Sequence, residues 1–147
     1  MLANQADIAK LIPHAGTMCL LQGIMECDAQ RIRCISSSHR DSHNPLRADN
    51  ELAALCGIEY AAQAMAAHGA WTVQVGGKPR AGYLTSVRVV VCRTMRLDTL
   101  QQDLIIDAEK IMGDETHVIY QFMLSAGPDQ IMRGRASVVL DAERIAK

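Results

Sequence analysis

One stretch of the chain limits its fold more than any other. Residues 56–69, CGIEYAAQAMAAHG, are nearly all small or apolar. A helix that is apolar on every side is a buried helix, and its alanines would let neighbouring elements approach closely. Glu59 stands in the middle of this run, and Gln63 follows one helical turn later. Because a buried carboxylate is costly unless it is paired or protonated, Glu59 needs a structural partner or a functional reason to be there.

Extended, alternating runs flank this helix, which we expect over about residues 52–71. The β-like runs lie at residues 17–28, 31–38, 83–97, 103–112, 116–127 and 131–143. A short helical turn at residues 7–12 precedes them, and polar or Gly- and Pro-containing segments separate them. This order predicts a single α+β domain over residues 1–147, in which one long helix is wrapped by one antiparallel sheet.

Charge and cysteine usage exclude several classes of protein. The net charge of −1 and the pI near 6.5 give no electrostatic footprint for nucleic acid or an anionic membrane. No apolar run is long enough to span a bilayer, and the first residues lack a secretion signal. We therefore expect a cytoplasmic protein without metal or cofactor, whose thiols are reduced. None of them forms a Cys-x-x-Cys pair: Cys19, Cys27, Cys34, Cys56 and Cys92.

Four segments carry a resemblance to a known family. They are LIPHAGTMCLLQGIMEC at residues 11–27, HNPLR at 43–47, GIEYAAQ at 57–63, and the long strand region at 81–107. Together they resemble the hotdog-fold β-hydroxyacyl-ACP dehydratases, and more closely the dehydratase-like proteins of aryl-polyene clusters. The resemblance implies a hotdog fold and dehydration of a 3-hydroxyacyl thioester carried by acyl carrier protein, in fatty-acid or aryl-polyene type lipid synthesis.

The sequence departs from the family's pattern near the expected base. The family's His-Phe-Pro-Gly stretch reads His43-Asn44-Pro45-Leu46, and the interval from His43 to Glu59 is about two residues longer than usual. Ala53 and Ala54 replace the family's Pro-Gly at the helix start. Because His39 lies in the same loop, both His43 and His39 are candidates for the base.

Dehydration defines what these groups would do. A neutral histidine, His43 or His39, would remove the C2 proton. Glu59, its pKa raised by an apolar site, would donate a proton to the leaving hydroxyl. Backbone N–H groups at the helix start would hold the thioester carbonyl.

Four further residues are candidates for substrate binding. Gly57 and Ala54 would leave room for the substrate, Gln63 would orient Glu59, and His14, which follows Pro13, is the fourth candidate.

The resemblance also implies that the site is shared between two subunits, with the loop histidine from one and the helix acid from the other. One helix cannot cover a six-stranded sheet from so short a chain without leaving an edge strand open. We expect a homodimer or a dimer-based oligomer, with acyl carrier protein as a partner and a different hotdog subunit as a further candidate.

Other interpretations of the same residues stay open. Glu59 could form a structural ion pair with Arg88 or Arg93, and a loop histidine is by default a surface residue. A hotdog thioesterase would use Glu59 to activate water or to attack the thioester. A non-catalytic hotdog subunit, which partners an active dehydratase, is the third possibility.

Overall fold

The computed structural model describes residues 1–12, 18–74, 82–114 and 116–140. Helices α1 and α2 and seven strands follow one another in the order β1, α1, β2, β3, α2, β4, β5, β6, β7. Two short 3₁₀ turns, η2 and η3, lie between β3 and α2. The elements are β1 (Ala3–Asn4), α1 (Gln5–Leu11), β2 (Gly23–Cys27), β3 (Arg31–Ser36), η2 (Ser38–Arg40), η3 (Ala54–Cys56), α2 (Gly57–Gln74), β4 (Gly82–Cys92), β5 (Leu104–Gly113), β6 (His117–Ala126) and β7 (Asp129–Leu140).

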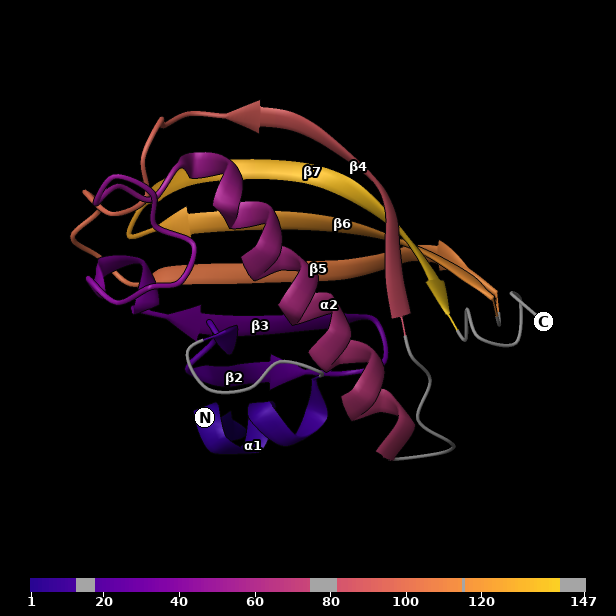
Figure 1. The fold of residues 1–147 in the computed structure, drawn as a ribbon. Helices are drawn as coiled ribbons and strands as arrows, with labels where there is room; N and C mark the ends of the chain where they lie inside the picture. The colour runs from indigo at the N-terminus through magenta and orange to yellow at the C-terminus, as the bar shows by residue number, and fades with distance from the viewer. Residues whose placement is uncertain (13–17, 75–81, 115, 141–147) are drawn as a thin grey trace.

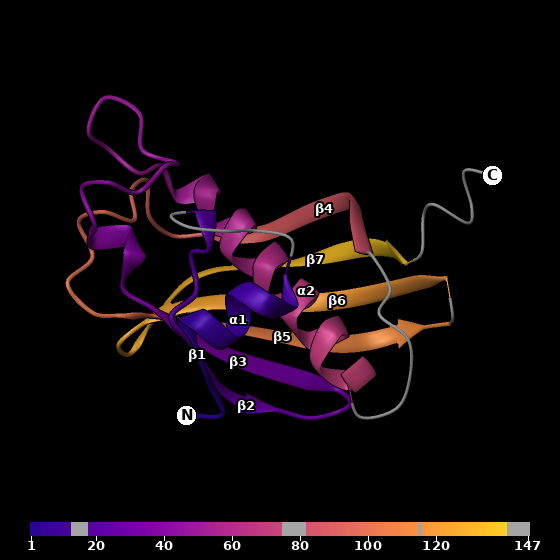
Figure 2. The ribbon, with the colours of Figure 1, turned by 60° about the horizontal axis from the view of Figure 1, so that its bottom comes forward.

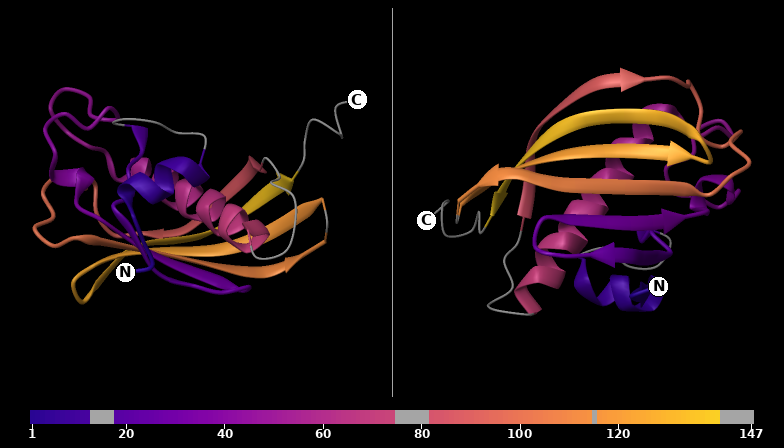
Figure 3. Two further views of the ribbon diagram at one scale, coloured as in Figure 1. Left: turned by 90° about the horizontal axis from the view of Figure 1, so that it is seen from below. Right: turned by 180° about the vertical axis from the view of Figure 1, so that it is seen from behind.

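All seven strands belong to one antiparallel sheet with the order β1-β2-β3-β5-β6-β7-β4. Helix α2 runs diagonally across one face of this sheet (Figure 1). Helix α1 lies on the same face, beside α2 at the β2 end (Figure 2). Seen from below and from behind, the opposite face carries no helix in the described part of the chain (Figure 3). The predicted hotdog arrangement, one long helix wrapped by a sheet, is confirmed.

Close packing against the sheet explains why α2 lacks a polar face. Ala61, Ala64 and Ala67 are fully buried, and Met65 is nearly so. A Cβ added at Gly57 would stand 2.9 Å from the Leu124 side chain, so the helix begins almost in contact with the sheet. Within the described ranges, no helix is both long enough and apolar enough to cross a membrane.

Short polar motifs set the turns around this core. The Asn4 and Asp7 side chains each accept the other residue's backbone N–H, a capping box that starts α1. The Asp28 carboxylate accepts two backbone N–H groups in the turn between β2 and β3. Gly127, with φ of 58°, turns the chain from β6 into β7.

Three predicted boundaries were wrong for a physical reason. In the described part of the run at 17–28, which starts at Met18, the strand covers only Gly23–Cys27, because the backbone of Met18 and Leu20 bonds to the Gln63 side chain instead of a neighbouring strand. The long helix starts at Gly57 and not at residue 52, and β4 ends at Cys92 and not at residue 97. Both shifts follow from backbone pairing between residues 52–54 and 95–97. The two-residue β1 adds a seventh strand to the six expected.

A buried histidine ties α2 to β6 and to the turn between β2 and β3. His68 Nδ1 lies 2.7 Å from the Tyr120 hydroxyl, and His68 Nε2 lies 2.8 Å from the Asp28 carbonyl. Because a carbonyl only accepts, we infer that Nε2 carries the proton and that Tyr120 donates to Nδ1. Burial lowers the pKa of His68 below its ordinary value.

Gly134 on β7 is packed so closely that a larger residue does not fit there. A Cβ there would collide with the Arg88 carbonyl oxygen and stand 2.8 Å from Phe122 Cζ, whereas a Cβ at Gly69 on α2 would meet nothing within 4 Å. Gly134→Ala should lower the free energy of unfolding by about 1–3 kcal/mol. Gly69→Ala should raise it by about 0.5–1 kcal/mol, because glycine disfavours a helix interior. Urea denaturation of both variants measures the two changes, and equal signs would contradict the packing described.

Burial of His68 should make the stability of the fold depend on pH. The pKa of His68 is lowered in the folded state. Below about pH 6.5 the unfolded chain therefore binds more protons than the folded one, and the free energy of unfolding decreases as the pH is lowered. We expect a slope of up to about 1.4 kcal/mol per pH unit from each such histidine. His68→Gln should make the slope shallower in urea denaturation series between about pH 5 and 7. The same change at the exposed His117 is the matched control and should leave the slope as it is.

Candidate active site

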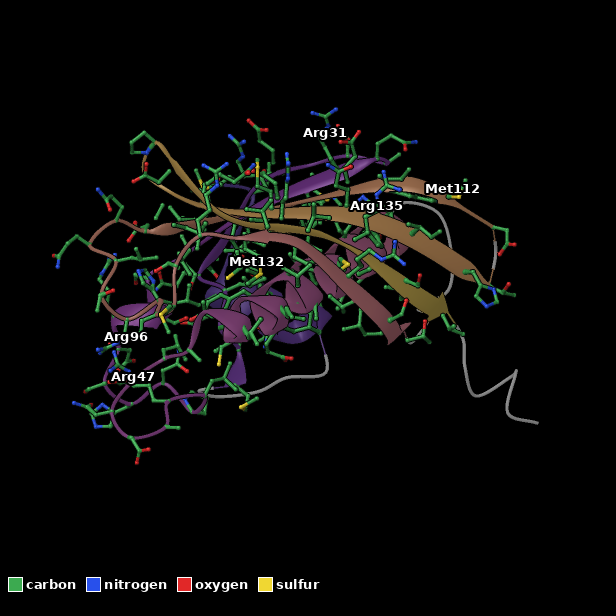
Figure 4. The ribbon with its side chains drawn as sticks, turned by 90° about the horizontal axis from the view of Figure 1, so that it is seen from above. Arg31, Arg47, Arg96, Met112, Met132 and Arg135 are labelled. Carbon is green, nitrogen blue, oxygen red and sulfur yellow. The ribbon has the colours of Figure 1, made fainter. Side chains whose placement is uncertain are left out.

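The segment between β3 and α2 carries both candidate histidines and is held in place by one arginine. The Arg47 guanidinium donates to the backbone carbonyls of Asp41, Asn50 and His39 at 2.8, 3.1 and 3.2 Å. Arg47 lies at the end of the molecule where α2 begins (Figure 4). Three carbonyl contacts from one rigid side chain fix the shape of this segment, which we call the histidine loop (residues 37–50).

A buried polar network connects the histidine loop to the first turn of α2. The Tyr60 hydroxyl lies 2.6 Å from Ser38 Oγ and accepts a hydrogen bond from the Asn44 side chain at 3.1 Å. Asn44 Nδ2 also donates to the Ser38 carbonyl. Tyr60 and Asn44 are buried, and burial raises the pKa of Tyr60 so that it stays a neutral hydroxyl. The sequence analysis missed these residues, although a lone tyrosine in an alanine-rich helix was a signal for such an anchor.

His43 is presented to solvent by this anchored loop. Its side chain is 89% exposed, and its Nδ1 lies 3.6 Å from an Asp41 carboxylate oxygen that also accepts the His43 backbone N–H. A polar cavity of about 340 Å³ opens beside it. The remaining lining residues come from α1, from the approach to β2 and from the loop: Gln5, Cys19, Gln22, Ser37, Ser38, Asp41, Asn44 and Pro45.

His39 lies in a different environment from His43. It is fully buried, and its Nε2 is 3.1 Å from the Leu100 carbonyl. Burial lowers its pKa. Its Nδ1 has no hydrogen-bond partner among the described residues. The ring therefore pins η2 to the segment after β4 and is enclosed within the chain.

Glu59 and Gln63 lie on successive turns of α2. Glu59 is half-buried, so the full burial expected from the sequence does not occur within one chain. Gln63 Nε2 is 3.4 Å from Glu59 Oε1, a long contact. Its shorter bonds hold the segment before β2: it donates to the Met18 carbonyl at 2.7 Å and accepts the Leu20 N–H at 2.9 Å. Gln63 is thus positioned mainly by the backbone, with Glu59 beside it.

The start of the helix offers less to a substrate than expected. The Ala54 N–H bonds to the Met95 carbonyl, and the Cys56 and Gly57 N–H groups bond within the 3₁₀ turn. These three donors are therefore occupied and do not await a thioester carbonyl. Gly57 faces Leu124 and Met132, which gives its missing side chain a packing reason. His14 lies outside the described residues.

The ion pair between Glu59 and Arg88 does not form within one chain. Arg88 is exposed and stands directly opposite Arg135 on the face of the sheet that α2 does not cover, while its neighbours Val87 and Val89 pack into the core. The other candidate, Arg93, is exposed just beyond the end of β4. A structural ion pair of Glu59 with Arg88 is therefore not formed within one chain.

A second, mainly apolar cavity of about 400 Å³ lies beside the start of α2. Arg96 on its rim is held by Asp98 and Glu51. Cys56 also lines it, and burial raises the pKa of the Cys56 thiol, which disfavours a nucleophilic thiolate. The other lining residues are Leu46, Ala48, Ala53 and Met95.

One chain does not bring the candidate base and acid into one cavity. His43 lines the polar cavity, and Glu59 is not among the residues around it. Acid–base chemistry between them would need the two groups within reach of one substrate.

Comparison with known proteins adds the family. A family model described as ApeP-like, ApeP dehydratase, matches residues 6–146. The dehydratase heterocomplex ApeI:P from Xenorhabdus doucetiae is similar, with a TM-score of 0.79, 22% identity and coverage of 90% of this chain and 89% of that chain. A thioesterase from Haemophilus influenzae gives a TM-score of 0.61, 10% identity and coverage of 95% and 92%. A mutant thioesterase from Pseudomonas aeruginosa gives 0.56, 13%, 82% and 80%. No curated protein sequence matches the chain significantly.

The two kinds of comparison carry different weight. The structural similarities, all at low sequence identity, establish the hotdog fold and include both dehydratases and thioesterases. The family model spans nearly the whole chain, from α1 to beyond β7. The chain therefore belongs to the ApeP-like dehydratase family.

Proposed function

We propose that this chain is a subunit of a 3-hydroxyacyl-thioester dehydratase whose substrate is carried by acyl carrier protein. The family match is the observation that carries the proposal. The geometry supports it through an exposed histidine on an anchored loop beside a polar cavity, and through a half-buried acid on the central helix.

In the proposed reaction, His43 Nε2 takes the C2 proton of the 3-hydroxyacyl thioester. Glu59 of the facing subunit gives a proton to the C3 hydroxyl, which leaves as water while the C2–C3 double bond forms. The imidazolium and the carboxylate then exchange the proton through solvent to restore the resting state. The Tyr60 network serves to hold the histidine loop still, because a base must be positioned to within a fraction of an ångström.

The proposed assembly joins two hotdog subunits along β4. This strand is the last of the sheet, it pairs only with β7 among the described strands, and the Val90 and Leu84 side chains on it are exposed. An open edge of this length is a template for strand pairing. The similarity to a dehydratase heterocomplex supports a second hotdog subunit as the partner.

Two alternatives remain as outcomes of one experiment. The thioesterase structures of the same fold favour hydrolysis as the first alternative, and the heterocomplex favours a non-catalytic partner subunit as the second. Incubating 3-hydroxyacyl-ACP of several chain lengths with the protein, and measuring water loss and free acid by mass spectrometry in the same run, separates them. The assay is run on the chain alone and on the tagged chain purified from its native host. The second sample retains any partner that is bound to the chain. Free acid without dehydration would reject the proposal.

Replacing the loop histidines separates chemistry from structure. His43→Ala should lower kcat by about 10²–10⁴-fold, the usual contribution of a general base, without loss of stability because the ring is exposed. His39→Ala should lower the melting temperature instead, since it removes a fully buried side chain. The exposed His117→Ala is the matched control and should change neither. Full activity of His43→Ala in a folded protein would assign the base elsewhere.

Glu59→Gln keeps size and polarity but removes the proton that is to be donated. Turnover should fall at least about 10²-fold, while the free energy of unfolding changes by less than about 1 kcal/mol, as for a half-buried side chain. The exposed Glu109→Gln on β5 is the control and should retain activity. A stability loss of several kcal/mol with unchanged turnover would instead mark Glu59 as a structural acid.

A further inference from the structure

The uncovered face of the sheet has a regular charge pattern across the strands. The backbone pairing aligns Arg31, Glu109, Gln121, Arg135 and Arg88 in one row across β3, β5, β6, β7 and β4. Figure 4 labels Arg31 and Arg135, which lie toward the two ends of this row.

A neighbouring row also begins with an arginine beside an acid. It contains Arg33, Asp107, Met123, Arg133 and Val91. Each row therefore begins with an arginine on β3 opposite an acid on β5. Neither row has an acid on β7 or β4, where the first row carries Arg135 and Arg88 and the second carries Arg133.

The two ends of these rows differ in how their charges are balanced. At the β3 end, Arg33 lies 2.7 Å from Asp107, and Arg31 lies 3.8 Å from Glu109. At the β4 end, Arg88, Arg133 and Arg135 are exposed, and none forms an ion pair with a described residue. Like charges directly opposite one another across a strand pair are destabilising, so the Arg88–Arg135 pair is unfavourable in an isolated chain.

This arginine cluster (Arg88, Arg133 and Arg135) lies at the open edge of the sheet. The sequence of β4 contains no acidic residue, and the sole acid of β7 is Asp129 at the far end of that strand. The cluster therefore has no local counter-charge in either strand. Any strand that pairs with β4 brings its own exposed side chains directly beside it.

Pairing β4 with a second copy of itself would intensify the repulsion. A two-fold axis places the same residues on both sides of an interface. When the axis passes near the middle of Gly82–Cys92, Arg88 comes within a residue or two of its own symmetry mate, and the Arg135 side chains flank both. Like charges juxtaposed across an interface suppress the wrong partner.

We propose that the β4 edge pairs with a different hotdog subunit that carries acidic side chains on the exposed face of its own edge strand, and that the arginine cluster disfavours self-pairing. The inference rests on the proposed pairing through β4 and adds which partner that edge takes. Charge complementarity specifies the partner's chemistry. A similar structure, at 22% identity, is itself a dehydratase heterocomplex, which supports a partner that differs from this chain.

A charge-reversed copy of the full chain can stand in for such a partner. The variant Arg88→Glu/Arg135→Glu keeps a like-charge contact within the chain but makes the edge acidic. Mixed with the wild type at ~50 mM NaCl, it should form mixed dimers at least about tenfold tighter than either matched dimer. Raising NaCl to ~500 mM should weaken the mixed dimer and strengthen the wild-type dimer. Salt screens the attraction between opposite charges in the first and the repulsion between arginines in the second. Native mass spectrometry and sedimentation measure these species.

Controls and hydrogen exchange distinguish the possible failures. Arg88→Gln/Arg135→Gln should self-pair more tightly than the wild type, and Arg31→Glu/Arg33→Glu, at the far end of the same face, should show no preference for the wild type. The first failure is the formation of mixed and matched dimers in random proportion while the amides of residues 84–92 are protected from exchange. This result would overturn the role of the arginine cluster in partner choice but would agree with pairing through β4. Unprotected β4 amides in every mixture would overturn both the role of the arginine cluster and the pairing through β4.

Discussion

The structure depends on one constraint: α2 has no polar face and must be enclosed. Its alanines and Gly57 let the sheet approach until a single added methyl group would touch Leu124. Close approach over the length of an 18-residue helix requires strands that curve around it, and curvature requires register shifts. The shifts occur in β2, β4, β5 and β7, where bulges increase the local twist. The wrapped shape of the sheet is thus a consequence of the composition of the helix.

Within such a helix, each polar side chain has a definite task. Tyr60 anchors the histidine loop, Gln63 holds the segment before β2, and His68 joins the turn after β2 to β6. These residues tie the irregular parts of the chain to the central helix, because buried polar groups must find partners. Glu59 differs from them in being half-buried.

The sequence was sufficient for the fold and for part of the site. Hydrophobic period predicted the helix and the order of the strands, since the apolar helix and the alternating runs have only one common way to be buried. It did not predict that Met18 and Leu20 would bond to Gln63, or that residues 52–54 would pair with 95–97, because these contacts join segments 40 to 45 residues apart. Local pattern carries no information about such pairs. For the same reason the sequence favoured His43 over His39 only narrowly: His39 is buried against Leu100, which is 61 residues away in the sequence.

The proposed division of the site between two subunits and the charge of the sheet edge have a common physical origin. The described part of the chain has one long helix and one sheet, and the sheet ends at β4, whose outer edge pairs with no described strand and which carries a cluster of arginines with β7. An edge of this kind must be closed by another strand or protected by charge. If the edge were only protected, the candidate base and acid would remain in separate environments. If it is closed by a chain of opposite charge, one contact satisfies the backbone, neutralises the arginines and sets a second subunit beside the half-buried Glu59. In the proposed assembly, one partner at β4 would therefore resolve both the open edge of the sheet and the separation of His43 from Glu59.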